Sequence, residues 1–357
     1  MDNLHRARIL IIKPSSLGDV IHTLPVAHCL KRSFPDTHIG WIVQESLARL
    51  LENDPAVDSV YRINIPSTSD PAAGRLAYFR AFSETRRTLK HLRTVFEEEP
   101  YDLVLDLHAS FRSGLLGRAN PDGKRFGFSD ARELNTQFQD RLIEVPDEVT
   151  HALEKNLLFC EALGCSPRNE DFFLCSGDAA ERRVNALLGG YGIKPDDRLV
   201  YIHSTARWET KFWFPERWAR LADLLIDRKG VKVLFGGTGE DREYISMIEA
   251  KMARTPIVVA GRCNLVETAA LLGRCAVYVG LDSGPMHMAA MAGVPVVALF
   301  GPTHPERVGP YGVPHVILKG GNLDCLGCRK RTCAKMSCME RIPVDMVVDG
   351  VLRLLAG

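Results

Sequence analysis

Short apolar runs alternate with stretches of helical periodicity along the first half of the chain. Runs without polar positions are typical of strands that are buried on both faces of a sheet. The expected strands are 9–12, 39–43, 57–63 and 103–107, and the expected helices are 20–33, 45–52 and 76–98. Strands that alternate with helices predict βαβ units and therefore a parallel sheet.

The same pattern begins again near Asp178. Strands are expected at 199–203, 231–235, 257–260, 276–280 and 294–300, with helices at 216–228, 240–253, 266–274 and 285–292. A polar stretch at 165–171 separates the two series, and a length of 357 residues favours two domains. We predict two Rossmann-like α/β domains, 1–170 and 171–342, that face each other across a cleft. A closing helix at 343–357 could pack on either one.

Composition and charge narrow the function classes. The formal net charge is +1, so no basic excess indicates a nucleic acid partner. The longest apolar runs, such as 294–300, are too short to span a membrane. Residues 1–8 carry charges and lead into the first expected strand, which does not fit a signal peptide. We expect a cytoplasmic protein, with peripheral membrane contact left open.

The turn after the first strand carries the first candidate for catalysis. Lys13-Pro-Ser-Ser-Leu-Gly-Asp19 places Asp19 at the carboxyl end of that strand, where open α/β sheets bind their ligands. Ser16 and Gly18 allow the backbone to approach a ligand closely. The alternative is that Asp19 only caps the following helix, because Asp is a preferred N-cap residue.

Three loops of the second half have the character of a nucleotide-sugar site. Ser204 and Thr205 follow a strand and precede Lys211, a combination that suits a diphosphate. Asp282-Ser283-Gly284 opens a helix that contains His287 and whose amino terminus can face an anion. The glycine-rich loop 235–241 has Glu240 as a possible ribose contact, but its spacing is not that of a dinucleotide fingerprint. For each loop the alternative is an ordinary capped turn.

A divalent metal is not expected at this site. No D-x-D motif occurs in the chain, so Lys211 and helix dipoles would stabilise a diphosphate leaving group in place of a carboxylate-held Mg²⁺.

Two of these segments resemble the motifs of a known family. The run from Lys13 to Pro25 is similar to the opening motif of the bacterial lipopolysaccharide heptosyltransferases, family 9 of the glycosyltransferases. Gly280-Leu-Asp-Ser-Gly-Pro-Met-His287, followed by Gly293-Val-Pro-Val and Phe300-Gly-Pro-Thr303, resembles the second motif. The resemblance implies a GT-B fold and an inverting transfer of heptose from ADP-heptose to the Kdo or heptose of the inner core, with no required cofactor.

The resemblance also implies roles for individual residues. Asp19 falls on the base that activates the acceptor hydroxyl. Ser204, Thr205 and Lys211 fall on donor phosphate contacts, and Asp282 on the donor sugar contact. Ser283, Gly284 and His287 fall in the donor-binding turn, and Glu240 is a looser match as a ribose contact. The form of the first motif favours the enzyme that adds the first heptose, which acts on Kdo-lipid A.

The charge pattern suggests candidate residues for acceptor binding. Arg75, Arg80, Arg86, Arg87, Lys90 and Arg93 lie on one expected helix, opposed only by Glu84. Such a face suits an acceptor with carboxylates and phosphates at a membrane surface, although charged helices are commonly just solvated. Arg112, after the fourth strand, is a further candidate, and Ser16 and Gly18 are expected beside the acceptor.

Four cysteines cluster near the end of the chain. Cys325, Cys328, Cys333 and Cys338 have the spacing x2, x4 and x4, of which only the first is typical of zinc sites. Free thiols, a structural metal and a regulatory disulfide are the three hypotheses for them.

Rival functions share the fold. Heptosyltransferase II, another GT-B transferase or a sugar-nucleotide epimerase would use similar donor loops, and a binding protein without catalysis would have no use for Asp19. An epimerase would need further acid and base residues.

Overall fold

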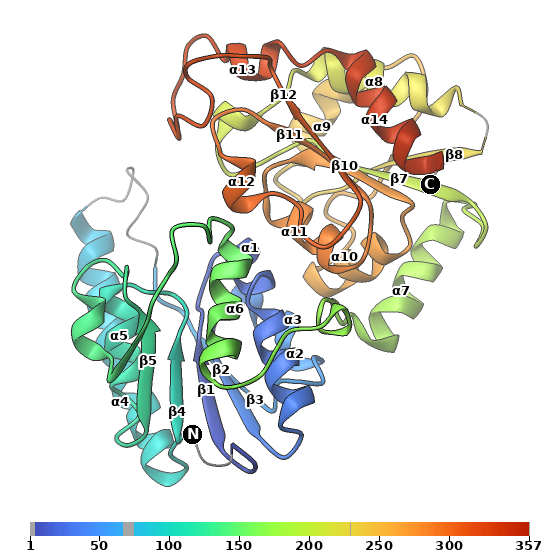
Figure 1. The fold of residues 1–357 in the computed structure, drawn as a ribbon. Helices are drawn as coiled ribbons and strands as arrows, with labels where there is room; N and C mark the ends of the chain where they lie inside the picture. The colour runs from blue at the N-terminus through green and yellow to red at the C-terminus, as the bar shows by residue number, and fades with distance from the viewer. Residues whose placement is uncertain (1–3, 67–74, 229, 357) are drawn as a thin grey trace. The chain divides into compact units, whose positions relative to one another are not determined.

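The chain divides into two compact units, Met1–Asp171 and Phe172–Gly357 (Figure 1). The computed structural model describes residues 4–66, 75–228 and 230–356, and for 75–78 the backbone only. Each unit contains one six-stranded sheet in which all strand pairs are parallel. No helix in the described ranges is long and apolar enough to cross a membrane.

The first unit has the strand order β3-β2-β1-β4-β5-β6. Its strands are β1 (Arg8–Ile12), β2 (His38–Gln44), β3 (Ser59–Ile63), β4 (Leu103–Asp106), β5 (Lys124–Phe128) and β6 (Arg141–Ile143). Its α-helices are α1 (Leu17–Ile21), α2 (Leu24–Ser33), α3 (Glu45–Glu52), α4 (Arg75–Glu98), α5 (Phe111–Gly117) and α6 (Ala152–Ala162), with 3₁₀ turns at Asn135–Phe138 and Asn169–Asp171. Helices α4 and α5 cover one face of the sheet, and α2 and α6 pack together on the other (Figure 1).

The second unit has the order β12-β11-β10-β7-β8-β9. Its strands are β7 (Arg198–His203), β8 (Val231–Phe235), β9 (Ile257–Val258), β10 (Val277–Leu281), β11 (Val296–Phe300) and β12 (His315–Lys319). Its α-helices are α7 (Gly177–Gly190), α8 (Pro215–Ile226), α9 (Arg242–Glu249), α10 (Leu265–Gly273), α11 (Gly284–Met291), α12 (Pro305–Val308), α13 (Ser337–Glu340) and α14 (Val344–Ala356), with a 3₁₀ turn at Glu209–Lys211. The closing helix α14 packs on α8 and on β10, β11 and β12, so it is part of this unit.

Both sheets reverse their strand order at the middle. In the first, the chain leaves the β1–β2–β3 half and returns beside β1 as β4, with Ile12 paired to Asp106. In the second, β10 returns beside β7, with Gly280 paired to His203. The carboxyl ends of the strands at such a switch point are where open α/β sheets bind ligands. The loops after β1, β4, β7 and β10 are therefore the positions to search for a site.

The apolar runs form the cores. Ile9, Leu10, Ile11 and Ile12 of β1 are fully buried because helices cover both faces of the sheet. In the second unit, Trp213 and Trp218 stack edge to face at 4.9 Å between ring centroids, within a core that α8 and α14 share with the strands. These cores fix the strand ends that carry the polar loops.

The elements expected from the sequence are confirmed in outline, and two details differ. The helix expected at 20–33 is two helices, since α1 ends at Ile21 and α2 begins at Leu24 with Pro25 in its first turn, where the missing N–H does no harm. Strands β5, β6 and β12 and helices α5, α7, α12 and α13 were not expected. β6 and β12 are partly exposed edge strands that begin with Arg141 and His315 and contain only two or three consecutive apolar residues.

Candidate active site

Asp19 lies in the first turn of α1, directly after the end of β1. Its Oδ2 accepts hydrogen bonds from the backbone N–H of Ser16 at 2.9 Å and from the Ser16 hydroxyl at 2.6 Å. The N-cap residue is Ser16, and Asp19 completes a capping box from the third helical position, so Asp19 does support the helix start, although it is not itself the N-cap residue. Its side chain is still 46% exposed, so a ligand can reach the carboxylate.

Lys13 places a positive charge beside this carboxylate. Its Nζ is 3.9 Å from Asp19 Oδ1 and donates a hydrogen bond to the carbonyl oxygen of Leu107 at 2.6 Å. Burial acts to raise the pKa of Asp19, but the Lys13 ammonium and the Ser16 hydrogen bonds outweigh it, so the pKa lies below its usual value. Asp19 is therefore an ionised carboxylate at neutral pH.

A buried carboxylate shapes the neighbouring loop after β4. Asp106 Oδ1 accepts from the backbone N–H groups of His108 and Ala109 at 3.1 and 3.0 Å. Its Oδ2 accepts from Ser113 Oγ at 2.9 Å and Asn135 Nδ2 at 2.7 Å. This loop brings His108 close to Lys13 and Asp19, and burial together with the Lys13 charge lowers the pKa of His108. His108 is thus held neutral beside the candidate base.

A cavity of about 460 Å³ opens at this edge of the first sheet. Its lining comes from the loops after β1, β2, β3 and β4 and from α5: Pro14, Ser15, Gln44, Ile63, Ile65, His108, Ser110, Phe111, Arg112, Ser113, Leu116 and Glu133. The wall combines apolar side chains with polar and charged ones that converge on the cavity, which suits a polar small molecule such as a sugar. Of the residues expected on the acceptor side, Arg112 lines the cavity, and Ser16 and Gly18 lie in the adjacent turn.

The arginines of α4 lie elsewhere in the first unit. Arg80, Arg86 and Arg87 are exposed on the face of α4 opposite its buried stripe, and they do not line the cavity. Arg87 pairs with Glu84 at 2.8 Å. The side chain of Arg75 lies outside the described residues. Of the arginines proposed on the acceptor side, Arg112 therefore lines the cavity, and Arg80, Arg86 and Arg87 do not.

In the second unit, the loops after β7 and β10 meet in a buried ion pair. Lys211 Nζ is 2.7 Å from Asp282 Oδ2 and also donates to the Asp282 carbonyl oxygen at 2.9 Å. Both side chains are largely buried, at 15% and 8% exposure. Lys211 also lies over the ring of Trp208 at 4.8 Å. The pair fixes an ammonium group at the switch point of the second sheet.

Helix α11 begins beside this pair. Ser283 is its N-cap residue and donates from its hydroxyl to the Leu281 carbonyl oxygen at 3.2 Å. Pro285 has no N–H and the Met286 N–H donates to the Ser283 carbonyl oxygen at 3.1 Å, so of the first three helical positions Gly284 offers an amide to a ligand. His287 Nε2 lies 3.9 Å from Asp282 Oδ1, one turn into the helix that Gly284 opens. Asp282, Ser283, Gly284, His287 and Lys211 are thus gathered at one place, as the sequence pattern suggested.

Several buried polar atoms at this edge have no hydrogen-bond partner in the described residues. They are His203 Nδ1, Ser204 Oγ and Thr303 Oγ1, and Ser204 is completely buried. Native proteins pair nearly all such atoms, so these are places where a polar ligand can complete the bonding. Burial lowers the pKa of His203, so its imidazole is neutral. Thr205, next to Ser204, is 5% exposed.

Glu240 is the donor candidate that the structure leaves apart. It is exposed in the loop after β8, and the turn there is held by Asp241, whose Oδ2 accepts from Thr238 N–H at 2.6 Å. Within the described ranges, no hydrogen bond or ion pair joins Glu240 to Lys211 or Asp282.

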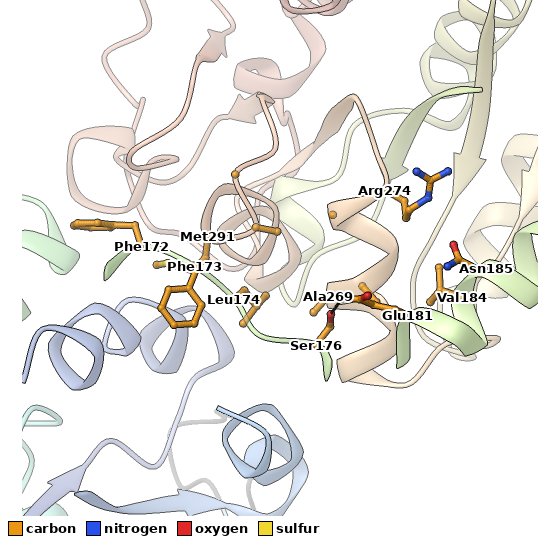
Figure 2. A pocket seen from close by; sticks show the side chains of 14 residues that line it. Phe172, Phe173, Leu174, Ser176, Glu181, Val184, Asn185, Ala269, Arg274 and Met291 are labelled. Atoms are coloured by element: carbon orange, nitrogen blue, oxygen red, sulfur yellow. Dashed lines mark hydrogen bonds between the residues drawn. The ribbon is translucent and has the colours of Figure 1, made fainter. Parts of the chain in front are cut away.

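A second cavity, of about 440 Å³, lies at the opposite end of α11 (Figure 2). Met291, at the carboxyl end of that helix, lines it together with residues of α7 and α10, among them Glu181 and Arg274, and Ser176 donates to Glu181 at 3.4 Å. None of the candidate donor residues lines this cavity. Since Lys211 and Asp282 lie at the other end of α11, we do not assign the donor to it.

The cysteine cluster near the end of the chain is mostly exposed. Cys325, Cys328 and Cys333 are exposed, and Cys338 is buried. Among the described residues, the group whose ligand atoms all lie within 4.8 Å of one another is a different one, formed by Cys29, Cys160 and Cys165. The structural metal hypothesised at Cys325–Cys338 stays a hypothesis.

Sequence reasoning missed Lys13, His108 and Asp106 as parts of the site. Each stands at the carboxyl end of β1 or β4, and that position was the available signal. Their contacts join two loops that lie far apart in the sequence, and the sequence does not show which loops meet.

The fold and the two switch-point sites define the class of protein. Two parallel-sheet domains of this kind, with a carboxylate at one sheet edge and a lysine with a helix amino terminus at the other, are those of a GT-B glycosyltransferase. Solved structures agree. The glycosyltransferase family 9 protein of Veillonella parvula matches with a TM-score of 0.81 at 24% identity, covering 99% of this chain and 98% of that one. The Escherichia coli heptosyltransferase WaaC with ADP matches with a TM-score of 0.72 at 22% identity, covering 97% of this chain and 99% of that one.

Sequence comparisons identify the family. The family model "Glycosyltransferase family 9 (heptosyltransferase)" matches residues 88–338. Lipopolysaccharide heptosyltransferase 1 of Pseudomonas aeruginosa is 31% identical over 339 residues, which is 91% of this chain and 87% of that protein. Lipopolysaccharide heptosyltransferase 3 of Escherichia coli is 25% identical over 95% of each chain. The chain belongs to glycosyltransferase family 9 and is a glycosyltransferase.

Proposed function

We propose that this enzyme transfers heptose from ADP-heptose to the inner core of lipopolysaccharide, and that it is the enzyme that adds the first heptose to Kdo. The family and the names of its relatives support the reaction. Relatives named heptosyltransferase 1 are 31% identical in Pseudomonas aeruginosa and 29% in Escherichia coli, against 25% for heptosyltransferase 3. The observation that carries the proposal is the exposed, ionised Asp19 carboxylate beside a cavity at the switch point of the first sheet.

Asp19 acts as the general base in the proposed mechanism. Inversion requires a base on one face of the anomeric carbon and a leaving group on the other. Asp19 Oδ1 takes the proton of the acceptor hydroxyl while Oδ2 stays fixed by Ser16. Lys13 holds the carboxylate ionised before the reaction. The cavity with Arg112 and His108 on its wall receives the acceptor sugar, and the Arg112 guanidinium suits its carboxylate.

The donor diphosphate binds at the edge of the second sheet. Lys211 supplies a fixed positive charge, and the Gly284 N–H at the start of α11 supplies a hydrogen bond. Ser204 Oγ and Thr303 Oγ1, which have no partner in the described residues, bind polar oxygens of the donor. As the bond to the anomeric carbon breaks, these groups stabilise the charge that develops on the ADP leaving group. Glu240 remains our proposed ribose contact.

The acceptor assignment is tested with purified enzyme, ADP-heptose and two lipid A acceptors, one ending in Kdo and one in heptose. We expect a mass increase of one heptose on the Kdo-terminated acceptor only. Transfer only to the heptose-terminated acceptor would instead identify a later enzyme of the core. If the enzyme binds ADP but transfers heptose to neither acceptor, the assignment would be reduced to a glycosyltransferase of unknown acceptor.

Replacement of Lys13 tests its effect on the base. In Lys13→Met the Asp19 carboxylate loses its nearest positive charge, so we expect its pKa to rise. Because the base must be ionised, the acidic limb of the kcat/KM profile of the variant moves to higher pH. The activity of the variant relative to the wild type is therefore lower at pH 6 than at alkaline pH. The measurement is the pH profile from pH 5 to 9, with Lys31→Met as the control. A uniform loss at every pH would show that Lys13 serves only the loop structure.

We further propose that α4 contacts the membrane that holds the acceptor. Its buried stripe is Ala81, Thr85, Leu92 and Phe96. An exposed row beside this stripe carries Phe79 and Phe82, each 73% exposed, and continues with Arg86, Lys90 and Arg93 at helical spacing. Among the described residues, Arg80, Arg86 and Lys90 form no ion pair. Exposed aromatic residues next to free cations are typical of helices that lie on anionic lipid surfaces.

Vesicle binding tests this surface. The double variant F79S/F82S is expected to bind vesicles with anionic lipid roughly tenfold or more weakly, since burying a Phe side chain contributes about 1.5–3 kcal/mol. Leu142→Ser, which removes an exposed apolar side chain from β6, should bind as the wild type does. The measurement is co-sedimentation at two salt concentrations. Equal binding of all three proteins would rule out α4 as the contact.

A further inference from the structure

Three cysteines of the first unit meet in its interior, away from the site described above. Cys29 lies on α2, Cys160 on α6, and Cys165 follows the end of α6. Cys29 and Cys160 are fully buried and Cys165 is 5% exposed. All three are free thiols, and their sulfur atoms lie within 4.8 Å of one another. None of them lines the cavity beside Asp19.

Polar contacts reach two of the three sulfur atoms. Arg32 Nη2 lies 3.7 Å from Cys29 Sγ, and Cys165 donates from its thiol to the Cys160 carbonyl oxygen at 3.3 Å. The same Arg32 guanidinium donates to the Asp171 carboxylate, so the charged group beside Cys29 is an ion pair.

The sulfur arrangement is close to that of a metal centre. Metal–sulfur bonds of about 2.3 Å place bound sulfurs roughly 3.8–4 Å apart, so side-chain adjustments of under an ångström suffice here. No His, Asp or Glu atom in the described ranges joins the group. Zn²⁺ takes four ligands in structural sites, whereas Cu⁺ is selected by soft thiolates and does not need a fourth.

We propose that Cys29, Cys160 and Cys165 form a three-sulfur binding site for one Cu⁺ ion. On binding, the ion replaces the thiol protons of all three cysteines, and three protons leave to the solvent. No electron is transferred in this step. Cys165, which retains slight exposure, is the ligand that the ion meets first.

The site would stabilise the segment that ends the first unit. Arg32 donates from Nε and Nη2 to the Asp171 carboxylate at 2.8 and 2.9 Å, and from Nη2 to the Ser166 carbonyl oxygen at 2.7 Å. His28 contacts the Asp171 carbonyl oxygen at 2.7 Å. A metal held by α2 and α6 therefore fixes the helices on which residues 166–171 are anchored, and its binding raises the melting temperature by mass action.

The test measures Cu⁺ binding by the full-length protein. In the background protein, the exposed Cys325, Cys328 and Cys333 are replaced by serine. Reduced protein is titrated anaerobically with Cu⁺ against the coloured chelator bicinchoninate. We expect one equivalent in this background and in Cys275→Ser, a buried thiol of the second unit, and none in Cys160→Ser. Cu⁺ should raise the melting temperature of the first two proteins and not of the third.

Two outcomes would overturn the proposal. In the first, the background protein is folded but binds no Cu⁺, or binds the same amount of Cu⁺ as Cys160→Ser. The other is Zn²⁺ that displaces Cu⁺ at equal concentration. If Cys160→Ser fails to fold, Cys165→Ser at the edge of the group replaces it and must show the same loss.

Discussion

Asp19→Asn should lower turnover roughly 10²- to 10⁴-fold, which is the usual contribution of a general base. The amide cannot accept the acceptor proton, although its oxygen can still accept the hydrogen bond from the Ser16 backbone N–H. The fold and α1 should therefore persist. ADP binds to the other unit in our proposal, so its dissociation constant should not change. Initial rates with saturating acceptor and an ADP titration give the two quantities.

Asp36→Asn is the matched control for this change. Asp36 is exposed in the turn before β2 and belongs to the same unit, so its loss should leave the rate unchanged. Turnover by Asp19→Asn within a few-fold of the wild type would contradict the assignment of Asp19 as the base. It would also revive the alternative that Asp19 only supports the helix start.

Lys211→Met should remove most donor affinity and also destabilise the second unit. The Lys211 ammonium is the fixed cation at the donor edge, and its loss leaves the buried Asp282 carboxylate without its partner. Breaking a buried ion pair in this way costs about 3–5 kcal/mol. We expect a lower melting temperature and a large rise in the ADP dissociation constant.

A second variant separates the two effects. In K211M/D282N no charge is left unpaired, so stability should recover in part while ADP binding stays weak. Lys251→Met is the control, because Lys251 pairs with Glu216 at 2.9 Å on the surface, where a pair contributes about 0–1 kcal/mol. If the double variant recovered donor affinity together with stability, Lys211 would have only a structural role.

The motifs were readable because their function depends on local sequence. The turn at Ser16–Asp19 and the start of α11 at Ser283–Gly284 are each built by consecutive residues, so their residue types show directly. Arg80, Arg86 and Arg87 were proposed from their charge spacing, which shows which residues share a helix face and nothing about a cavity, whereas Arg112 was proposed from its position after a strand and lines the cavity. Glu240 was placed by its glycine-rich loop, and the structure does not join it to the Lys211–Asp282 pair.

By itself, the sequence determined the α/β class, the two series of βαβ units and the positions of both motif loops, because apolar periodicity and turn residues are local properties. The tertiary structure decided which loops meet. Lys13 is held at Leu107 because β1 and β4 pair across the switch point, and Lys211 reaches Asp282 because β7 and β10 do. The meeting of Cys29 with Cys160 and Cys165 depends in the same way on the packing of α2 against α6. Such contacts arise from strand order and helix packing, which bring together residues that no local pattern connects.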